Sequence, residues 1–219
     1  MLASANVQRR IFRTVRQKVQ RYAAGEERRC LYWAYFGLIE LIKQGFQACL
    51  QAGSVSWLRV TREEYDAGCQ TSHFSMVWSP EGALSKAAEA MGALPEMHVW
   101  LGLLGTRKRG PVEPADTELV DFSTGHLKQM CQETGMPWTA PDPPRFLWTR
   151  FENMPELVSY EPIREATMYA DRTIKQLVDE GKVPDAKTLA GGGNMPYLQG
   201  RLPGGNSQKG SRRRRRRGR

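Results

Sequence analysis

The chain has 219 residues, a formal net charge of +9 and 40% hydrophobic residues, so it is long and apolar enough to bury the core of a single domain. This composition excludes a wholly disordered chain. The longest uncharged run, residues 44–58, is shorter than the roughly 20 apolar residues of a membrane span, so we expect none. The four cysteines form no CxxC pair, which argues against a structural zinc site and for reduced thiols in a cytoplasmic protein.

The positive charge gathers at the C-terminal end of the sequence. Residues 209–219 contain eight basic residues and no acidic one, and the remainder, with 24 basic and 23 acidic residues, has a net charge of only +1. The net positive charge of the whole chain therefore does not indicate a nucleic-acid-binding domain. This segment is either a solvated end of no defined role or a non-specific, salt-sensitive contact for polyanions, through Arg212, Arg213, Arg214, Arg215, Arg216 and Arg217.

Residues 7–22 have the pattern of a basic amphipathic helix. Arginine and lysine occupy one face, and apolar side chains recur every three or four residues on the other, at Val7, Ile11, Val15, Val19 and Tyr22. We interpret the segment as a surface helix packed on a domain. The same composition is also typical of an organelle-targeting presequence, or of a basic helix that binds membranes or nucleic acid.

A second helix is predicted over residues 28–52, and its composition differs from that of the first. In its first half, apolar residues cover most of the circumference instead of one stripe. A helix that is apolar nearly all round is a buried one, so we expect this helix to form the centre of the domain. Gly53 is expected to end it.

The segments that follow alternate between strand and helix composition. Strands are predicted at residues 55–61, 74–78, 97–103 and 118–122, and helices at residues 81–91, 125–134 and 161–179. Between them we expect a long hairpin loop at 105–117 and an irregular Pro-rich stretch at 135–146.

These elements predict a single α+β domain over residues 1–187, with helices packed on an antiparallel sheet. Residues 188–219 are rich in glycine, proline and arginine and contain few apolar side chains. We expect them to form a disordered tail, because they have too little apolar surface to fold.

Three of the predicted elements carry residues suited to nucleophilic catalysis. Cys30 lies near the start of the buried helix, His98 lies on the strand at 97–103, and Asp121 lies on the next strand. A helix N-terminus and an adjacent imidazolium both favour the thiolate form in which cysteine attacks. Adjacent antiparallel strands can bring His98 and Asp121 together on one face, where the carboxylate would orient the imidazole and stabilise its protonated form.

In this order, three motifs resemble the transglutaminase-like group of papain-like cysteine enzymes: Cys30-Leu31-Tyr32-Trp33-Ala34, His98-Val99-Trp100 and Val120-Asp121-Phe122-Ser123. The resemblance covers about residues 28–125. It implies a papain-like core, in which a buried central helix packs on an antiparallel sheet. It also implies acyl transfer through a thioester, with Cys30 as nucleophile, His98 as the group that moves protons and Asp121 as the group that orients His98. The group includes peptidases, amidases, cross-linking enzymes and catalytically inactive relatives.

Other residues compete for these roles. His126 would either cap the helix that follows it or be the true base, and His73 precedes a strand. Cys49 and Cys131 are expected to be buried hydrophobic residues within helices, and Cys69 a loop residue.

The donors of an oxyanion hole are only partly predictable. The backbone N–H of Cys30 is the natural first donor, because it lies at a helix start. Gln17 and Gln20 both have a suitable side chain for the second, and the sequence does not choose between them.

Two functions remain open. We favour a cysteine-dependent acyl-transfer enzyme that hydrolyses an amide or peptide bond, because water needs no second binding site, whereas an amine as second substrate would make it a transferase. The alternative is a catalytically inactive papain-like scaffold whose Arg-rich tail binds nucleic acid or another polyanion. The sequence has no nucleotide-binding or metalloprotease motif, and its three histidines are not spaced as a metal cluster, so no cofactor and no metal are expected.

Overall fold

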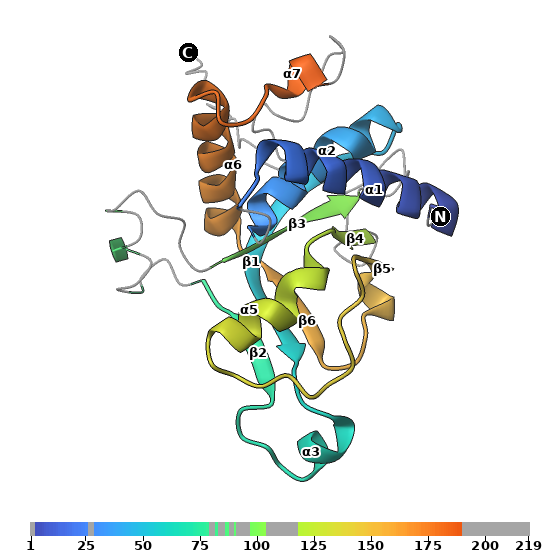
Figure 1. The fold of residues 1–219 in the computed structure, drawn as a ribbon, viewed down its shortest axis with the longest axis vertical. Helices are drawn as coiled ribbons and strands as arrows, with labels where there is room; N and C mark the ends of the chain where they lie inside the picture. Colours follow the sequence, from blue (N-terminus) through green and yellow to red (C-terminus); the bar gives the residue numbers. More distant parts are fainter. Residues whose placement is uncertain are drawn as a thin grey trace, which may run out of the picture.

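The computed structural model describes residues 3–25, 29–78, 97–103 and 118–189, together with residues 82, 86, 87 and 90. Its helices are α1 (Ala5–Tyr22), α2 (Cys30–Lys43), α3 (Arg62–Asp66), η2 (Thr124–His126), α5 (Leu127–Glu133), η3 (Phe151–Asn153), α6 (Arg164–Asp179) and α7 (Ala186–Leu189). Its strands are β1 (Ala48–Leu58), β2 (His73–Met76), β3 (His98–Leu103), β4 (Glu118–Asp121), β5 (Leu147–Arg150) and β6 (Val158–Pro162). The described residues form an α+β domain (Figure 1).

The strands form one antiparallel sheet with the order β2-β1-β3-β4-β5, and β6 pairs with β1 outside that path. The first half of β1 pairs with β3 and its second half pairs with both β2 and β6. Val55, for example, lies opposite Met76 of β2 and opposite Tyr160 of β6, so these two strands flank β1 on opposite edges. The long strand β1 therefore joins all the parts of the sheet.

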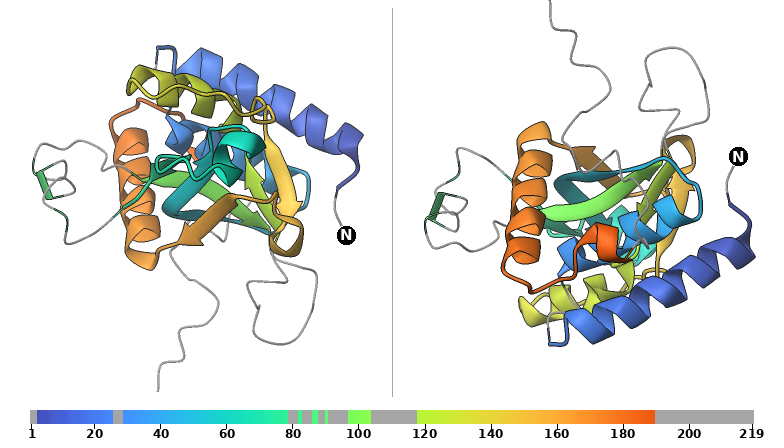
Figure 2. Two further views of the ribbon diagram at one scale, coloured as in Figure 1. Left: turned by 90° about the horizontal axis from the view of Figure 1, so that it is seen from below. Right: turned by 90° about the horizontal axis from the view of Figure 1, so that it is seen from above.

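Alternate residues of β3 and β4 belong to two different apolar cores, because successive side chains of a strand point to opposite faces of the sheet. Val99 and Leu101 pack in a core with residues of α1, α2 and α6, whereas Trp100 and Leu119 pack in a second core with residues of α5. Helix α2 lies between α1 and the sheet (Figure 2). The residues from Leu31 to Leu41 are all buried, as the sequence predicted for a central helix.

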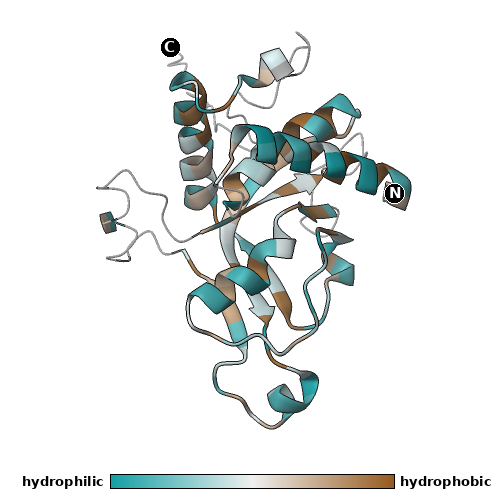
Figure 3. Ribbon diagram, in the orientation of Figure 1, coloured by the Kyte–Doolittle hydropathy of each residue, from teal (hydrophilic) through white to brown (hydrophobic). Residues whose placement is uncertain are grey.

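Helix α1 is amphipathic and packs on the domain, which confirms the interpretation as a surface helix. Ile11, Val15 and Val19 are buried, and the hydrophilic side of the helix faces outward (Figure 3). Helix α6 has the same character, with Ala166, Ala170 and Ile174 buried. Within the described part of the chain, no helix is both long enough and apolar enough to cross a membrane.

The prediction of one helix over residues 28–52 is wrong at its C-terminal end. Helix α2 ends at Lys43, and Ala48 already begins β1. Gly45 has a φ of 83°, and the backbone N–H groups of Gly45 and Phe46 donate to the carbonyl oxygens of Ile42 and Leu41. These two bonds and the left-handed residue form a Schellman motif, which ends the helix.

Other predictions differ from the structure in smaller ways. The sequence patterns predict neither α3 nor the strands β5 and β6, and α6 begins at Arg164, later than expected. Of the helix expected at 81–91, residues 86, 87 and 90 are helical and most others lie outside the described residues. The loop at 105–117 also lies outside them, as does residue 190 and all that follows. The expected domain boundary at residue 187 falls within α7, so residues 188 and 189 are helical instead of part of a tail.

Candidate active site

Cys30 is the first residue of α2. Its neighbour Arg29 is the N-cap, with extended backbone angles φ −77° and ψ 107°, so the helix begins at the cysteine itself. The first backbone N–H groups of a helix have no partner within it, and together with the helix dipole they favour a negative charge nearby. The Cys30 thiol is free and half-buried, and it donates to the carbonyl oxygen of Met97 at 3.9 Å.

His98 and Asp121 lie on neighbouring strands and contact one another. Leu101 of β3 lies opposite Val120 of β4, and this register puts both side chains on the same face of the sheet. The Nε2 atom of His98 lies 2.6 Å from Oδ2 of Asp121. Both residues are only 1% exposed, so water has little access to this pair.

The Asp121 carboxylate accepts hydrogen bonds from three residues. Besides His98, the Ser123 backbone N–H and hydroxyl donate to Oδ1 at 2.8 and 2.7 Å, and the Tyr160 hydroxyl donates to Oδ2 at 2.7 Å. Burial raises the pKa of Asp121, but the charge of His98 and the bonds from His98 and Ser123 outweigh it and lower the pKa below its ordinary value. The buried carboxylate therefore stays ionised at neutral pH.

The second ring nitrogen of His98, Nδ1, is buried and makes no hydrogen bond of ordinary geometry within the described residues. Burial lowers the pKa of His98, but the negative charges of Asp121 and Cys30 outweigh it and raise the pKa to about 10. Cys30 thus raises the pKa of the ring through both its charge and a side-chain contact. Because Asp121 contacts Nε2, Nδ1 is the ring nitrogen that remains for another partner.

Tyr160, on β6, is the member of this cluster that sequence patterns did not identify. Its ring centroid lies 6.0 Å from that of His98 and 5.1 Å from that of Trp100, edge-on to the latter. Burial, and then the charge of Asp121, raise the pKa of Tyr160 well above its ordinary value, so the hydroxyl keeps its proton and remains a donor. The aromatic residues and the two strands close the carboxylate off from solvent.

The competing histidines lie elsewhere in the fold. His126 ends η2, and its ring packs on Trp33 of α2 with 5.5 Å between the ring centroids. His73 begins β2, where Nδ1 lies 2.9 Å from the Ser72 hydroxyl. The histidine that contacts Asp121 is therefore His98.

The other three thiols have ordinary surroundings. Cys49 lies on β1 and donates to the Gly102 carbonyl oxygen at 3.6 Å, so the prediction that it lies in a helix is wrong. Cys131 is buried in α5 and donates to the Met136 carbonyl oxygen at 3.5 Å, and burial raises the pKa of both thiols. Cys69 is exposed, after α3.

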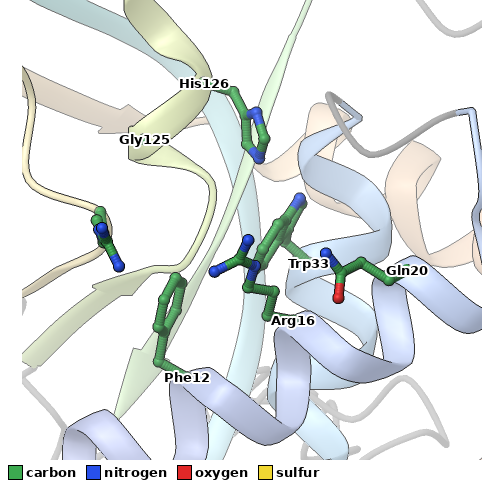
Figure 4. Close-up of a pocket in the computed structure, with 7 residues that line it drawn as sticks. Phe12, Arg16, Gln20, Trp33, Gly125 and His126 are labelled. Carbon is green, nitrogen blue, oxygen red and sulfur yellow. The ribbon is translucent and has the colours of Figure 1, made fainter.

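A pocket of about 310 Å³ opens beside α2, between α1 and the segment that carries η2 (Figure 4). It is lined by Phe12, Arg16, Gln20, Trp33, Gly125, His126 and Arg145. Trp33 is three residues after Cys30 on α2, so the pocket begins one helical turn from the thiol. Gln20 lines this pocket and Gln17 does not, which makes Gln20 the better placed of the two candidate amide donors.

No group of three or more His, Cys, Asp or Glu side chains that could hold a metal ion occurs among the residues that the structure describes. The structure brings together four polar groups at the start of α2 and on β3, β4 and β6: a thiol, an imidazole, a carboxylate and a phenol. Such a set can move protons and supply a nucleophile without a metal.

Comparison with known proteins adds little to this description. No protein-family model matches the chain, and no curated protein matches it. A crystal structure from a genomics project is similar over 87% of this chain and 79% of its own, with 14% sequence identity and a TM-score of 0.49.

Proposed function

We propose that the protein is a cysteine-dependent acyl-transfer enzyme with a papain-like, transglutaminase-like core, and that it hydrolyses an amide or peptide bond. The observation that carries the proposal is the position of one ring between two partners. His98 is bonded to buried Asp121 through Nε2. Its other ring nitrogen, Nδ1, has no hydrogen bond of ordinary geometry within the described residues, and Cys30 raises the pKa of the ring. A purely structural histidine would be expected to use both ring nitrogens in hydrogen bonds.

The raised pKa of His98 sets the starting state of the proposed reaction. With a pKa of about 10 the ring is protonated and positively charged at neutral pH, and this charge beside Cys30 would favour the thiolate form in which cysteine attacks. The Cys30 sulfur then attacks the carbonyl carbon of the substrate, and the carbonyl electrons move to its oxygen. When the C–N bond breaks, Nδ1 of His98 gives its proton to the leaving nitrogen, and a thioester remains on Cys30.

Hydrolysis of the thioester reverses these proton movements. Neutral His98 takes a proton from a water molecule as the water oxygen attacks the thioester carbon. The C–S bond breaks, the acid product leaves, and the sulfur returns with the electrons of that bond. An amine in place of water would give a new amide, and the residues of this site would act in the same way.

The negative oxygen of each tetrahedral intermediate needs donors that are already in position. The backbone N–H of Cys30 has no partner within α2, because it lies in the first turn of the helix. The Gln20 side chain is exposed on α1 and lines the pocket next to α2, so we assign it the role of second donor.

The proposal is tested by trapping the acyl-enzyme. The protein is mixed with p-nitrophenyl acetate, an activated ester, and the release of nitrophenolate and the mass of each cysteine-containing peptide are followed. We expect one acetyl group on Cys30 and its loss with time, as water hydrolyses the thioester. Exposed Cys69 in the same sample reports the reactivity of an ordinary thiol.

Two variants make the result decisive. Cys30→Ala should release nitrophenolate no faster than the exposed thiol alone accounts for, and His98→Ala should slow acetylation of Cys30 about 10²–10⁴-fold. Equal acetylation of Cys30 and Cys69 in the wild-type protein would contradict the proposal. It would favour the inactive scaffold instead.

A further inference from the structure

The pocket between α1, α2 and η2 has charged walls and an aromatic floor. Two of its seven lining residues are arginines and none is acidic. Gly125 contributes no side chain there, and a Cβ at this position would lie 3.3 Å from the backbone of Arg145. The glycine thus lets the segment of Arg145 lie close to η2 and form a wall of the pocket.

The two guanidinium groups of the pocket are available for a ligand. Arg16 and Arg145 are exposed, and neither has a hydrogen-bond or ion-pair partner among the residues that the structure describes. Other cations of α1 are engaged: Arg10 donates to Gln44 at 2.8 Å, and Lys18 pairs with Glu40. Among the described residues, neither Arg16 nor Arg145 pairs with an acidic side chain, so the pocket has a positive charge.

The floor of the pocket is aromatic. Phe12 and Trp33 stack with 5.8 Å between ring centroids and 13° between ring planes, and the His126 ring lies against Trp33. Trp33 is only 4% exposed, so it forms a rigid surface. Arg16 projects from α1 into the space between Phe12, Trp33 and His126 (Figure 4). A ligand on this floor would have its polar end beside the guanidinium.

We propose that this pocket binds a small ligand with a carboxylate or phosphate group next to a flat apolar group. Guanidinium groups bind both anions through paired, charge-assisted hydrogen bonds, and planar groups stack on aromatic side chains. A volume of about 310 Å³ is at the small end for ligand pockets, so it suits a single ring or a side chain with its anionic end. The inference goes beyond the proposed acyl transfer: Gln20 lines the pocket, but Cys30, His98 and Asp121 do not, and the two arginines that would bind the anion have no role in that reaction.

Binding is measured by isothermal titration calorimetry with three probes. Hippurate offers a carboxylate and a phenyl ring, phenyl phosphate offers a phosphate and the same ring, and the neutral amide of hippurate lacks the charge. We expect at least one anion to bind and the amide to bind at least ten-fold more weakly. The stronger of the two anions identifies the group that the pocket takes.

Variants then locate the site. Arg16→Gln and Arg145→Gln should each raise the Kd of the better anion about ten-fold, since each removes a charge-assisted hydrogen bond. Arg13→Gln is the matched control, because Arg13 is exposed one turn from Arg16 on the same helix and does not line the pocket. Its Kd should stay within about two-fold of the wild-type value, a change small against the ten-fold expected for a lost contact.

Four results would overturn the inference: no binding of either anion, equal binding of the amide, wild-type affinity in both pocket variants, or an equal loss in the Arg13 variant. The last would mean that the basic helix attracts anions without a defined site. Cys30→Ala should bind like the wild type, so failure of acyl transfer and failure of this pocket are observed separately.

Discussion

The Tyr160 hydroxyl donates to Oδ2 of Asp121, the same carboxylate oxygen that lies 2.6 Å from the His98 ring. Two donors thus share one oxygen, and the Ser123 backbone and side chain occupy the other. An ionised carboxylate in a protein interior is tolerated only when such partners surround it. Tyr160 therefore acts through Asp121: it stabilises the charge that in turn holds His98.

Replacing Tyr160 by Phe removes one of these donors and keeps the ring. We expect a loss of about 1.5–3 kcal/mol in the free energy of unfolding, because the lost hydrogen bond goes to a charged group. Tyr35→Phe is the control, since the Tyr35 hydroxyl donates to a neutral acceptor, the Pro184 carbonyl oxygen, at 2.7 Å. It should cost about 1 kcal/mol. Urea denaturation of both variants tests the difference, and equal losses would contradict the role given to Tyr160.

Tyr160 could not be recognised from the sequence, and the reason is physical. The segment Val158–Pro162 contains a charged residue and a proline, and it has no strong strand pattern of its own. It becomes a strand because it pairs with β1, which is about a hundred residues earlier in the chain. His98 and Asp121, in contrast, lie on strands that hydrophobic composition identifies directly.

The C-terminal boundary of the predicted second helix is wrong for a different reason. Residues 44–52 contain glutamine, alanine and leucine, which favour helix in isolation. The signal that ends the helix is Gly45 followed by an apolar residue, Phe46, the sequence of a Schellman motif. Because the helix ends at this glycine, the following residues can form β1, in which Ala48, Leu50 and Ala52 are the alternate buried residues.

The charge state of His98 predicts how stability varies with pH. Its pKa in the folded protein, about 10, exceeds the roughly 6.5 of an unfolded histidine, so protonation favours folding. This stabilisation is complete below about pH 6.5 and is lost as the pH rises through about 10. The free energy of unfolding, measured by urea denaturation across this range, should therefore fall with pH.

Two variants isolate this effect from other titrating groups. Asp121→Asn removes the charge that holds the His98 proton, so the decline of stability between about pH 6.5 and 10 should flatten. Ser123→Ala preserves the contact of His98 with Asp121 and should keep the wild-type decline. The assignment is wrong if the asparagine variant keeps the full slope.

Gly37 allows α2 to pack closely against the sheet. A Cβ there would lie 2.6 Å from the Phe122 ring and 2.8 Å from a Leu101 methyl group. Gly37→Ala should therefore destabilise the protein by about 1–2 kcal/mol, because overpacking outweighs the better helix propensity of alanine. Thermal or urea denaturation measures the change.

A second substitution checks the cause at Gly37. Phe122→Leu removes the ring atoms that the new methyl group would meet, so the double variant should lose less stability than the sum of the two single variants. Strict additivity would show that Phe122 is not the source of the strain. Any shift of α2 in Gly37→Ala would also move Cys30, so labelling of the thiol gives a second readout.

The roles of the two histidines near α2 are separated by the pH dependence of Cys30 alkylation. In the wild-type protein, iodoacetamide should label Cys30 rapidly at pH values well below about 8.5, where a free thiol is mostly protonated, and exposed Cys69 serves as the comparison. His98→Ala should remove this low-pH reactivity and lower turnover of any substrate about 10²–10⁴-fold. His126→Ala should leave both unchanged, because His126 packs on Trp33 and not on Asp121.

Asp121→Asn completes this set of variants. The amide preserves the shape of the carboxylate but removes its charge, so the His98 ring loses both its orientation and the partner of its protonated form. We expect turnover to fall while the circular dichroism spectrum stays like that of the wild type. Loss of low-pH labelling in His126→Ala but not in His98→Ala would show that the base is His126. If no variant changes the labelling and Cys30 reacts like Cys69, the site has the geometry of a catalytic triad but is catalytically inactive.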